Sequence, residues 1–142
     1  MMPLPPTNFP LDKTFFAAVT ARLPTANTMG LVMTPEGRVK DKVKRILKGS
    51  GYWFMPVQNG MGAPALDFYC CVNGYFLAIE TKAEGKKPSD RQIATAESIL
   101  QHRGGVLIIV GMDGAGLLPN YLTYIHSLPP PNLPSNLDRY AT

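Results

Sequence analysis

The chain has 142 residues, of which 45% are hydrophobic, and this suits one domain with a modest core. Its formal net charge of +4, from 14 basic and 10 acidic residues, is compatible with a polyphosphate partner but does not identify one. No apolar stretch approaches the roughly 20 residues of a membrane span, and no basic region followed by an apolar one suggests a secretory signal.

The first 32 residues are expected to form an extension that is irregular in part. Residues 1–10 are rich in proline and should lack regular structure. Residues 11–23 predict a short amphipathic helix, with Phe15, Phe16, Val19 and Leu23 on its apolar side. Met33 directly precedes the segment that carries the motifs described below. A start of translation at Met33 would leave that segment complete.

A helix is predicted to begin after Thr34, with threonine as the cap and Pro35 at the first helical position. Gly49 and Gly51 end it. Its apolar residues recur at helical spacing, at Val39, Val43, Ile46 and Leu47.

Glu36 extends this apolar stripe by one turn, because it precedes Val39 by three residues. Its carboxylate is therefore directed toward the core side, either as a functional group or as an ordinary first-turn glutamate that the helix dipole favours. The other helix faces carry six cations, which form either a solvated surface or a phosphate-binding one. They are Arg38, Lys40, Lys42, Lys44, Arg45 and Lys48.

Three strands are predicted next. Tyr52 to Val57 is the first, and a glycine-rich loop leads from it to a hairpin with strands from Asp67 to Val72 and from Tyr75 to Ile79. Asn73-Gly74 between them suits a two-residue type I′ turn, which fixes the register. Val72 then faces Tyr75, and continuing the count outward places Asp67 directly opposite Glu80.

Opposed residues of a hairpin share one face, with Cβ atoms about 4.5–5.5 Å apart. Two carboxylates at that distance repel unless a cation or a shared proton compensates. Lys82 lies on the same face as Glu80, because the two are separated by one residue. The pattern predicts a divalent-metal site with an adjacent cation; the alternative is a surface ion pair between Lys82 and the hairpin acids.

A second helix and a buried strand complete the predicted core. After a polar loop with Lys86 and Lys87, Ser89 and Gln92 form a capping box of the Ser-x-x-Gln type. The inward line of this helix is Ile93, Ala96, Leu100 and Arg103. Val106 to Val110 is a continuous apolar run that follows a helical crossover, so a parallel partner strand is expected.

The remaining segments are expected to be a loop, a helix and a tail. Gly111 to Gly116 should be a loop. A short last helix should carry Leu118, Leu122, Ile125 and Leu128, with its start limited by Pro119. The proline-rich residues 129–142 should be extended or disordered.

The cysteines and histidines give no metal-binding pattern. Cys70 and Cys71 are neighbours in a strand and point to opposite faces, so a mutual disulfide would strain the backbone. Two reduced cysteines suit a cytoplasmic location. His102 and His126 are isolated, and we expect surface residues rather than zinc ligands.

Asp67, Glu80 and Lys82 together resemble the PD-(D/E)xK nuclease superfamily, in which an aspartate begins one strand and Glu-x-Lys lies on the next. More narrowly, residues 34–111 resemble the VRR nuclease family (VRR-NUC), found in phages and in DNA-repair proteins. That family has an upstream helix with a glutamate, a Gly-x-Pro turn before the aspartate, and a glutamine that opens the following helix. The matching positions are Glu36, Gly62-Ala63-Pro64 and Gln92.

One position departs from the family pattern. The aspartate usually follows the proline directly, whereas Ala65-Leu66 intervene here. The hairpin count still places Asp67 opposite Glu80, so the departure concerns the turn rather than the ligand.

The resemblance implies an α/β fold with a restriction-endonuclease-like core in the order α-β-β-β-α-β, in which helices flank a mixed central sheet. The expected organisation is an extension at 1–32, a nuclease-like domain at 33–128 and a proline-rich tail at 129–142.

The resemblance also implies a site. Asp67, Glu80 and the backbone carbonyl of Thr81 would hold Mg²⁺ or Mn²⁺, and Glu36 would bind a second ion directly or through a water. Lys82 would position the attacking water and offset charge on the phosphate, and Gln92 would face the site as well as cap its helix. The expected catalytic residues are thus Glu36, Asp67, Glu80, Lys82 and Gln92.

The implied function is metal-dependent cleavage of DNA, as a structure-selective endonuclease of replication, recombination or repair in the cytoplasm of a bacterial or phage-infected cell. No helix suggests base reading, so branched or otherwise structured DNA is the expected partner of a monomer or homodimer. The six helix cations with Lys86 and Lys87 would contact phosphates. The alternatives are a non-catalytic DNA-binding module of nuclease fold and a structural protein.

Overall fold

The computed structural model describes residues 33–58, 60, 62, 64–131, 133, 135 and 137–140. The irregular segment expected at 1–10, the helix expected at 11–23 and Ala63 of the Gly-x-Pro turn lie outside the described residues. In the described ranges, no helix is long and apolar enough to cross a membrane.

The elements follow the predicted order. Helix α2 (Pro35–Leu47) precedes strands β1 (Tyr52–Phe54), β2 (Phe68–Val72) and β3 (Tyr75–Lys82). Helix α3 (Asp90–Gln101) then leads to strand β4 (Gly105–Val110). Helices α4 (Gly111–Gly116) and α5 (Leu118–Ser127) and the 3-10 helix η1 (Leu137–Tyr140) complete the chain.

The sheet is mixed, with strand order β1-β2-β3-β4. The first three strands are antiparallel, and β3 pairs in parallel with β4 across the α3 crossover. Val72 faces Tyr75 and Phe68 faces Ile79, so the hairpin register is the predicted one. Asn73 and Gly74 have φ angles of 51° and 84°, as a type I′ turn requires.

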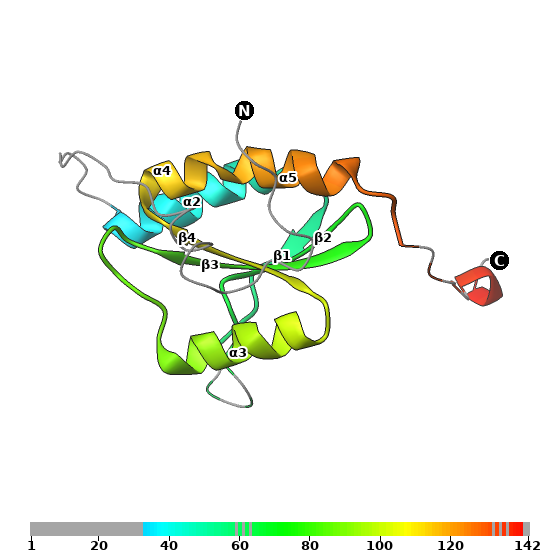
Figure 1. Cartoon of the computed structure of the whole chain (residues 1–142), viewed down its shortest axis with the longest axis horizontal. Helices are drawn as coiled ribbons and strands as arrows, with labels where there is room; N and C mark the ends of the chain where they lie inside the picture. The colour runs from blue at the N-terminus through cyan, green and yellow to red at the C-terminus, as the bar shows by residue number, and fades with distance from the viewer. Residues whose placement is uncertain are drawn as a thin grey trace.

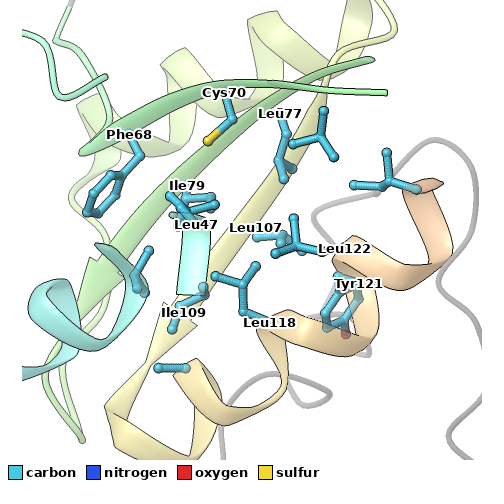
Figure 2. Close-up of a cluster of buried hydrophobic side chains, with 14 of the residues drawn as sticks. Leu47, Phe68, Cys70, Leu77, Ile79, Leu107, Ile109, Leu118, Tyr121 and Leu122 are labelled. Carbon is cyan, nitrogen blue, oxygen red and sulfur yellow. The ribbon is translucent and has the colours of Figure 1, made fainter. Parts of the chain in front are cut away.

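Helices cover both faces of the sheet: α2, α4 and α5 lie on one side and α3 on the other (Figure 1). The larger core lies between the sheet and α2, α4 and α5. Figure 2 shows Phe68, Leu77, Ile79 and Leu107 of the strands directed toward side chains of the helices, among them Leu47 and Leu118. A smaller core on the α3 side contains Leu66, Ala78, Ala96, Val106, Ile108 and Val110.

The helix starts follow their capping signals. The hydroxyl of Thr34 accepts the amide of Gly37 at 3.0 Å, with Pro35 in the first turn of α2. Ser89 and Gln92 form a complete capping box at the start of α3. Pro119 lies in the first turn of α5, where its missing amide costs no helical hydrogen bond.

The hairpin turn also holds the end of α5. The side-chain amide of Asn73 donates to the carbonyls of Ile125 at 3.0 Å and Leu128 at 2.8 Å. The hydroxyl of Tyr75 donates to the carbonyl of Pro129. The tip of the β2–β3 hairpin is therefore fixed to the helix layer.

Two expectations fail at helix boundaries. The loop expected at Gly111 to Gly116 is helix α4, because its buried Gly114 and Ala115 allow close packing against α2, which overrides the low helix propensity of glycine. Arg103 does not belong to the inward line of α3. The helix ends at Gln101, and Arg103 is exposed with a left-handed φ of 67°.

Two further segments differ in extent. The first strand ends at Phe54 rather than at Val57, because Pro56 cannot donate a ladder hydrogen bond. The tail is not extended throughout, since residues 137–140 form a 3-10 turn that begins where the amide of Leu137 donates to the hydroxyl of Ser135.

The cysteines and histidines are as expected. Cys70 is buried, Cys71 is exposed, and both are free thiols. Burial raises the pKa of Cys70 to about 12, so its thiol stays protonated and unreactive. His102 and His126 are exposed.

Candidate functional site

The predicted acidic residues meet near the C-terminal end of β3, just beyond its last pair with β2 and where it still pairs with β4. Asp67 lies one residue before β2, and its backbone amide donates to the Glu80 carboxylate at 3.1 Å. The register of the hairpin therefore continues one step past the last paired residues, Phe68 and Ile79.

The carboxylate of Asp67 contacts Thr81, the neighbour of Glu80. Its Oδ2 accepts the amide of Thr81 at 2.9 Å and the hydroxyl of Thr81 at 2.6 Å. The amide and carbonyl of one strand residue point to the same side of the strand, so the Thr81 carbonyl also faces the Asp67 side. A carboxylate and a main-chain carbonyl are thereby directed to one place.

Glu80 is buried, with 1% of its surface exposed. Its Oε2 lies 3.2 Å from the Lys82 ammonium and accepts the side-chain amide of Gln92 at 2.6 Å. Burial, and secondarily the charge of Asp67, raise the pKa of Glu80 to about 7, although Lys82 opposes the shift. An acid in this environment holds its negative charge at a cost that a nearby cation would offset.

Gln92 has both of the roles that the sequence suggests. Its Oε1 accepts the amide of Ser89 at 2.9 Å in the capping box, while its Nε2 donates to Glu80. The start of α3 is thus tied to the carboxylate on β3.

Glu36 and two lysines link α2 to the hairpin acids. Lys82 lies 4.0 Å from Glu36, and Lys40 lies 3.3 Å from Glu36 and 3.4 Å from Asp67. Burial alone would lower the pKa of Lys40, but the charges of Asp67 and Glu36 outweigh it and raise this pKa above its usual 10.5. Lys40 is therefore held as a cation between two carboxylates.

The position of Lys40 was not predicted from the sequence, which placed this lysine on the phosphate-binding surface. A signal was available: Glu36 and Lys40 are an i, i+4 pair, so they lie on the same helix face. The hydroxyl of Thr81 was also missed, because only its main-chain carbonyl was considered.

The other predicted phosphate-contacting cations lie in different environments. Lys42 donates to the carbonyl of Met112 in α4 at 3.1 Å, and Arg45 pairs with Asp41 at 2.8 Å. Arg38 is half-buried. The exposed members of the set are Lys44, Arg45, Lys48, Lys86 and Lys87.

The donor set suits a hard divalent cation. Asp67, Glu80 and the Thr81 carbonyl offer oxygen ligands, which Mg²⁺ and Mn²⁺ prefer, and two carboxylates are the usual protein contribution to a Mg²⁺ site. Among the described residues, no group of three or more His, Cys, Asp and Glu side chains is close enough to hold a metal ion. The fit therefore rests on two carboxylates and a main-chain oxygen. Glu36 is not close enough to join them and pairs with Lys40 and Lys82 instead.

The departure before Asp67 has a structural explanation. Leu66 is fully buried in the core on the α3 side. The carbonyl of Pro64 accepts the hydroxyl of Thr95 in α3 at 2.8 Å. Leu66 in the core and Pro64 on α3 thus anchor the turn without displacing Asp67.

A solved structure described as a VRR_NUC domain has a similar fold. The likeness has a TM-score of 0.54 at 22% sequence identity and covers 63% of this chain and 99% of that one. No protein-family model and no curated protein matches the chain. The chain therefore has the α/β fold of a VRR_NUC domain, and the expected resemblance is confirmed at the level of the fold.

Proposed function

We propose that the chain is a Mg²⁺- or Mn²⁺-dependent nuclease that cleaves branched or otherwise structured DNA as an endonuclease. One observation carries this proposal: Asp67, Glu80 and Lys82 converge at the end of β3, with Glu36 and Gln92 contacting them from helices on opposite faces of the sheet. The burial of Glu80 and its raised pKa also support a functional site, because perturbed pKa values of this kind cluster at such sites.

Asp67, Glu80 and the carbonyl of Thr81 would hold the metal. When bound, such an ion would activate a water molecule and polarise the scissile phosphate. Gln92 keeps the Glu80 carboxylate in place by its 2.6 Å hydrogen bond, and Thr81 does the same for Asp67 through two hydrogen bonds. Both ligands are therefore preorganised by hydrogen bonds, from Gln92 to Glu80 and from the amide and hydroxyl of Thr81 to Asp67.

Lys82 would act on the reacting phosphate. Its ammonium lies between Glu80 at 3.2 Å and Glu36 at 4.0 Å, so its position is defined from two sides. A fixed cation at this place offsets the negative charge that develops on the phosphate oxygens during attack.

A non-catalytic DNA-binding module is the second candidate. One observation favours it: each carboxylate of Glu36, Asp67 and Glu80 already pairs with Lys40 or Lys82, so two cations offset two of the three negative charges without a metal ion. The two candidates differ in what a chelator does, because DNA binding by a site that needs no metal ion would not respond to it.

Cleavage of labelled linear, flap and four-way-junction DNA with Mg²⁺, Mn²⁺ or chelator tests the proposal. We expect metal-dependent cleavage that Glu80→Gln abolishes while DNA binding persists or strengthens, because a negative charge near phosphate is removed. Glu97→Gln is the matched control, since Glu97 is an exposed glutamate of α3. Cleavage by Glu80→Gln, or metal-independent binding without cleavage by the wild type, would overturn the nuclease proposal.

A further inference from the structure

Four aromatic side chains form a line across the sheet face on the α3 side. Tyr52 and Phe54 of β1 begin the line, and Tyr69 of β2 and Phe76 of β3 continue it, since the strand register places all four on one face. Successive ring centroids are 6.4, 5.8 and 5.6 Å apart. We call these four residues the aromatic strip.

Three of the four side chains of the aromatic strip are exposed to solvent. Tyr52 is 71% exposed, Phe76 48% and Phe54 46%. On the opposite face, Trp53 and Phe68 between the same strands pack into the main core. Helix α3 makes its principal contacts with β4, and of the four residues Tyr69 alone is half-buried, against the smaller core. A contiguous exposed apolar surface of this kind is a candidate interaction site.

Basic side chains adjoin the strip. Two grooves, of about 420 and 370 Å³, lie between the sheet and α3, and Phe76 and Ile99 line both of them. Arg91 lines the first groove and Arg103 the second, and these arginines are the charged residues among the described lining residues. Aromatic faces beside arginines suit a partner with flat π-systems and negative charge.

The strip is continuous with the candidate site. Tyr69 lies two residues after Asp67 on the same strand segment, and its hydroxyl accepts the amide of Leu66 at 3.3 Å. Arg91 directly precedes Gln92, whose side chain contacts Glu80. Glu80 and Phe76 also lie on one face of β3. A strand of nucleic acid whose phosphate meets the site can therefore extend over the strip.

We propose that the aromatic strip stacks the bases of an unpaired DNA segment beside the nuclease site, with Arg91 and Arg103 near its phosphates. This inference rests on the proposed function and specifies its substrate: structured DNA with a single-stranded part. Stacking is tolerant of sequence because every base has a π-face, which agrees with a surface that offers rings rather than a set of hydrogen-bonding groups.

The test compares two double variants, one without the two rings of β1 and one that keeps both rings and a single hydroxyl. Tyr52→Leu with Phe54→Leu keeps apolar bulk and removes both rings, whereas Tyr52→Phe with Phe54→Tyr keeps them. Binding is measured by fluorescence anisotropy in chelator, with labelled oligothymidylate and with an abasic strand of the same length. We expect the leucine variant to bind oligothymidylate at least about fivefold more weakly, the lower end of base stacking, with abasic binding unchanged.

Three results would overturn the inference. They are equal binding of oligothymidylate and abasic strand by the wild type, equal weakening for both strands in the leucine variant, and a change of oligomeric state in that variant by light scattering. The last would make the strip a protein interface. Cleavage by the wild type is scored separately with Mg²⁺: cleavage with base-independent binding refutes the strip alone, and base-dependent binding without cleavage refutes the nuclease alone.

Discussion

Gln92 donates to Glu80 through Nε2 at 2.6 Å while its Oε1 accepts the Ser89 amide at 2.9 Å, so one side chain both caps α3 and fixes the buried acid. This double contact couples the helix start to the proposed metal ligand. Its two parts can be separated by substitution, because glutamate also serves at this position of a capping box but, when ionised, cannot donate a hydrogen bond.

Gln92→Glu should retain the capping box and lose the hydrogen bond to Glu80. The added carboxylate repels Glu80, so we expect weaker metal-dependent cleavage and a lower melting temperature at pH 8 than at pH 6. Ser89→Ala is the control, since it removes the cap and leaves Glu80 untouched. It should cost about 1 kcal/mol of folding free energy, with cleavage per folded molecule retained. Equal loss of cleavage in both variants would mean that Gln92 acts through the helix cap.

The raised pKa of Glu80 predicts how stability depends on pH without metal. The folded state keeps this proton up to about pH 7, whereas the unfolded chain releases it near 4.5. The stabilising contribution is therefore fully present below pH 4.5 and is lost as the pH rises through 7, by an amount on the order of 3 kcal/mol. Glu80→Gln cannot ionise, so urea denaturation in chelator should show the variant gaining on the wild type between pH 5 and 8. A difference in unfolding free energy between variant and wild type that stays constant from pH 5 to 8 would refute the raised pKa of Glu80.

Lys40 should compete with metal for Asp67, because the two cations neutralise the same carboxylate. Lys40→Met is expected to lower the melting temperature in chelator, since Glu36 and Asp67 lose their shared partner. It should also show a larger rise in melting temperature with Mg²⁺ than the wild type. Lys44→Met is the matched control, an exposed lysine of the same helix. A smaller Mg²⁺ effect in Lys40→Met than in the control would show that Lys40 assists metal binding.

The exposed cations Lys44 of α2 and Lys48 at its C-cap predict the salt dependence of DNA binding. Replacing Lys44 and Lys48 by Gln should reduce the slope of log K against log salt by roughly 0.9 for each phosphate that the variant no longer neutralises, whatever the DNA sequence. Lys42→Gln should lower the melting temperature instead, because Lys42 contacts the carbonyl of Met112 within the protein. An unchanged slope in the Lys44 and Lys48 variant would assign both residues to a solvated surface.

The hairpin could be predicted because its determinants are local. Asn73-Gly74 permits the two positive φ angles of a tight turn, and a two-residue turn fixes every pair beyond it. The opposition of Asp67 and Glu80 then follows by counting. The capping signals at Thr34 and Ser89 are local in the same sense.

What could not be predicted depends on packing between distant segments. Lys40, Lys42 and Lys44 have similar sequence surroundings but different structural ones. Lys40 pairs with Asp67 in the site, Lys42 donates to the carbonyl of Met112 in α4, and Lys44 is exposed. The contacts of each lysine depend on which residues of the sheet and of α4 pack against its face of α2. The helical state of Gly111–Gly116 likewise arises from contact with α2 rather than from its own propensity.

Lys82 has a structural and a kinetic role that one substitution can separate. Without metal it is a counter-charge for Glu80 at 3.2 Å, so Lys82→Ala should lower the melting temperature in chelator. With a metal ion bound, the ion would offset the charge of Glu80, and Lys82 would instead meet charge that develops as the phosphate is attacked. Lys82→Ala should then bind metal and DNA almost normally and cleave about 10²-fold or more slowly, the scale of one missing transition-state donor.

Lys82→Arg distinguishes position from charge. Its planar fork keeps the positive charge but cannot occupy the site of an ammonium held between Glu80 and Glu36, so it should restore the melting temperature more fully than the cleavage rate. Single-turnover cleavage and melting in chelator, measured on the same preparations, give both readouts. Wild-type cleavage by Lys82→Ala together with a lower melting temperature would assign Lys82 to stability alone.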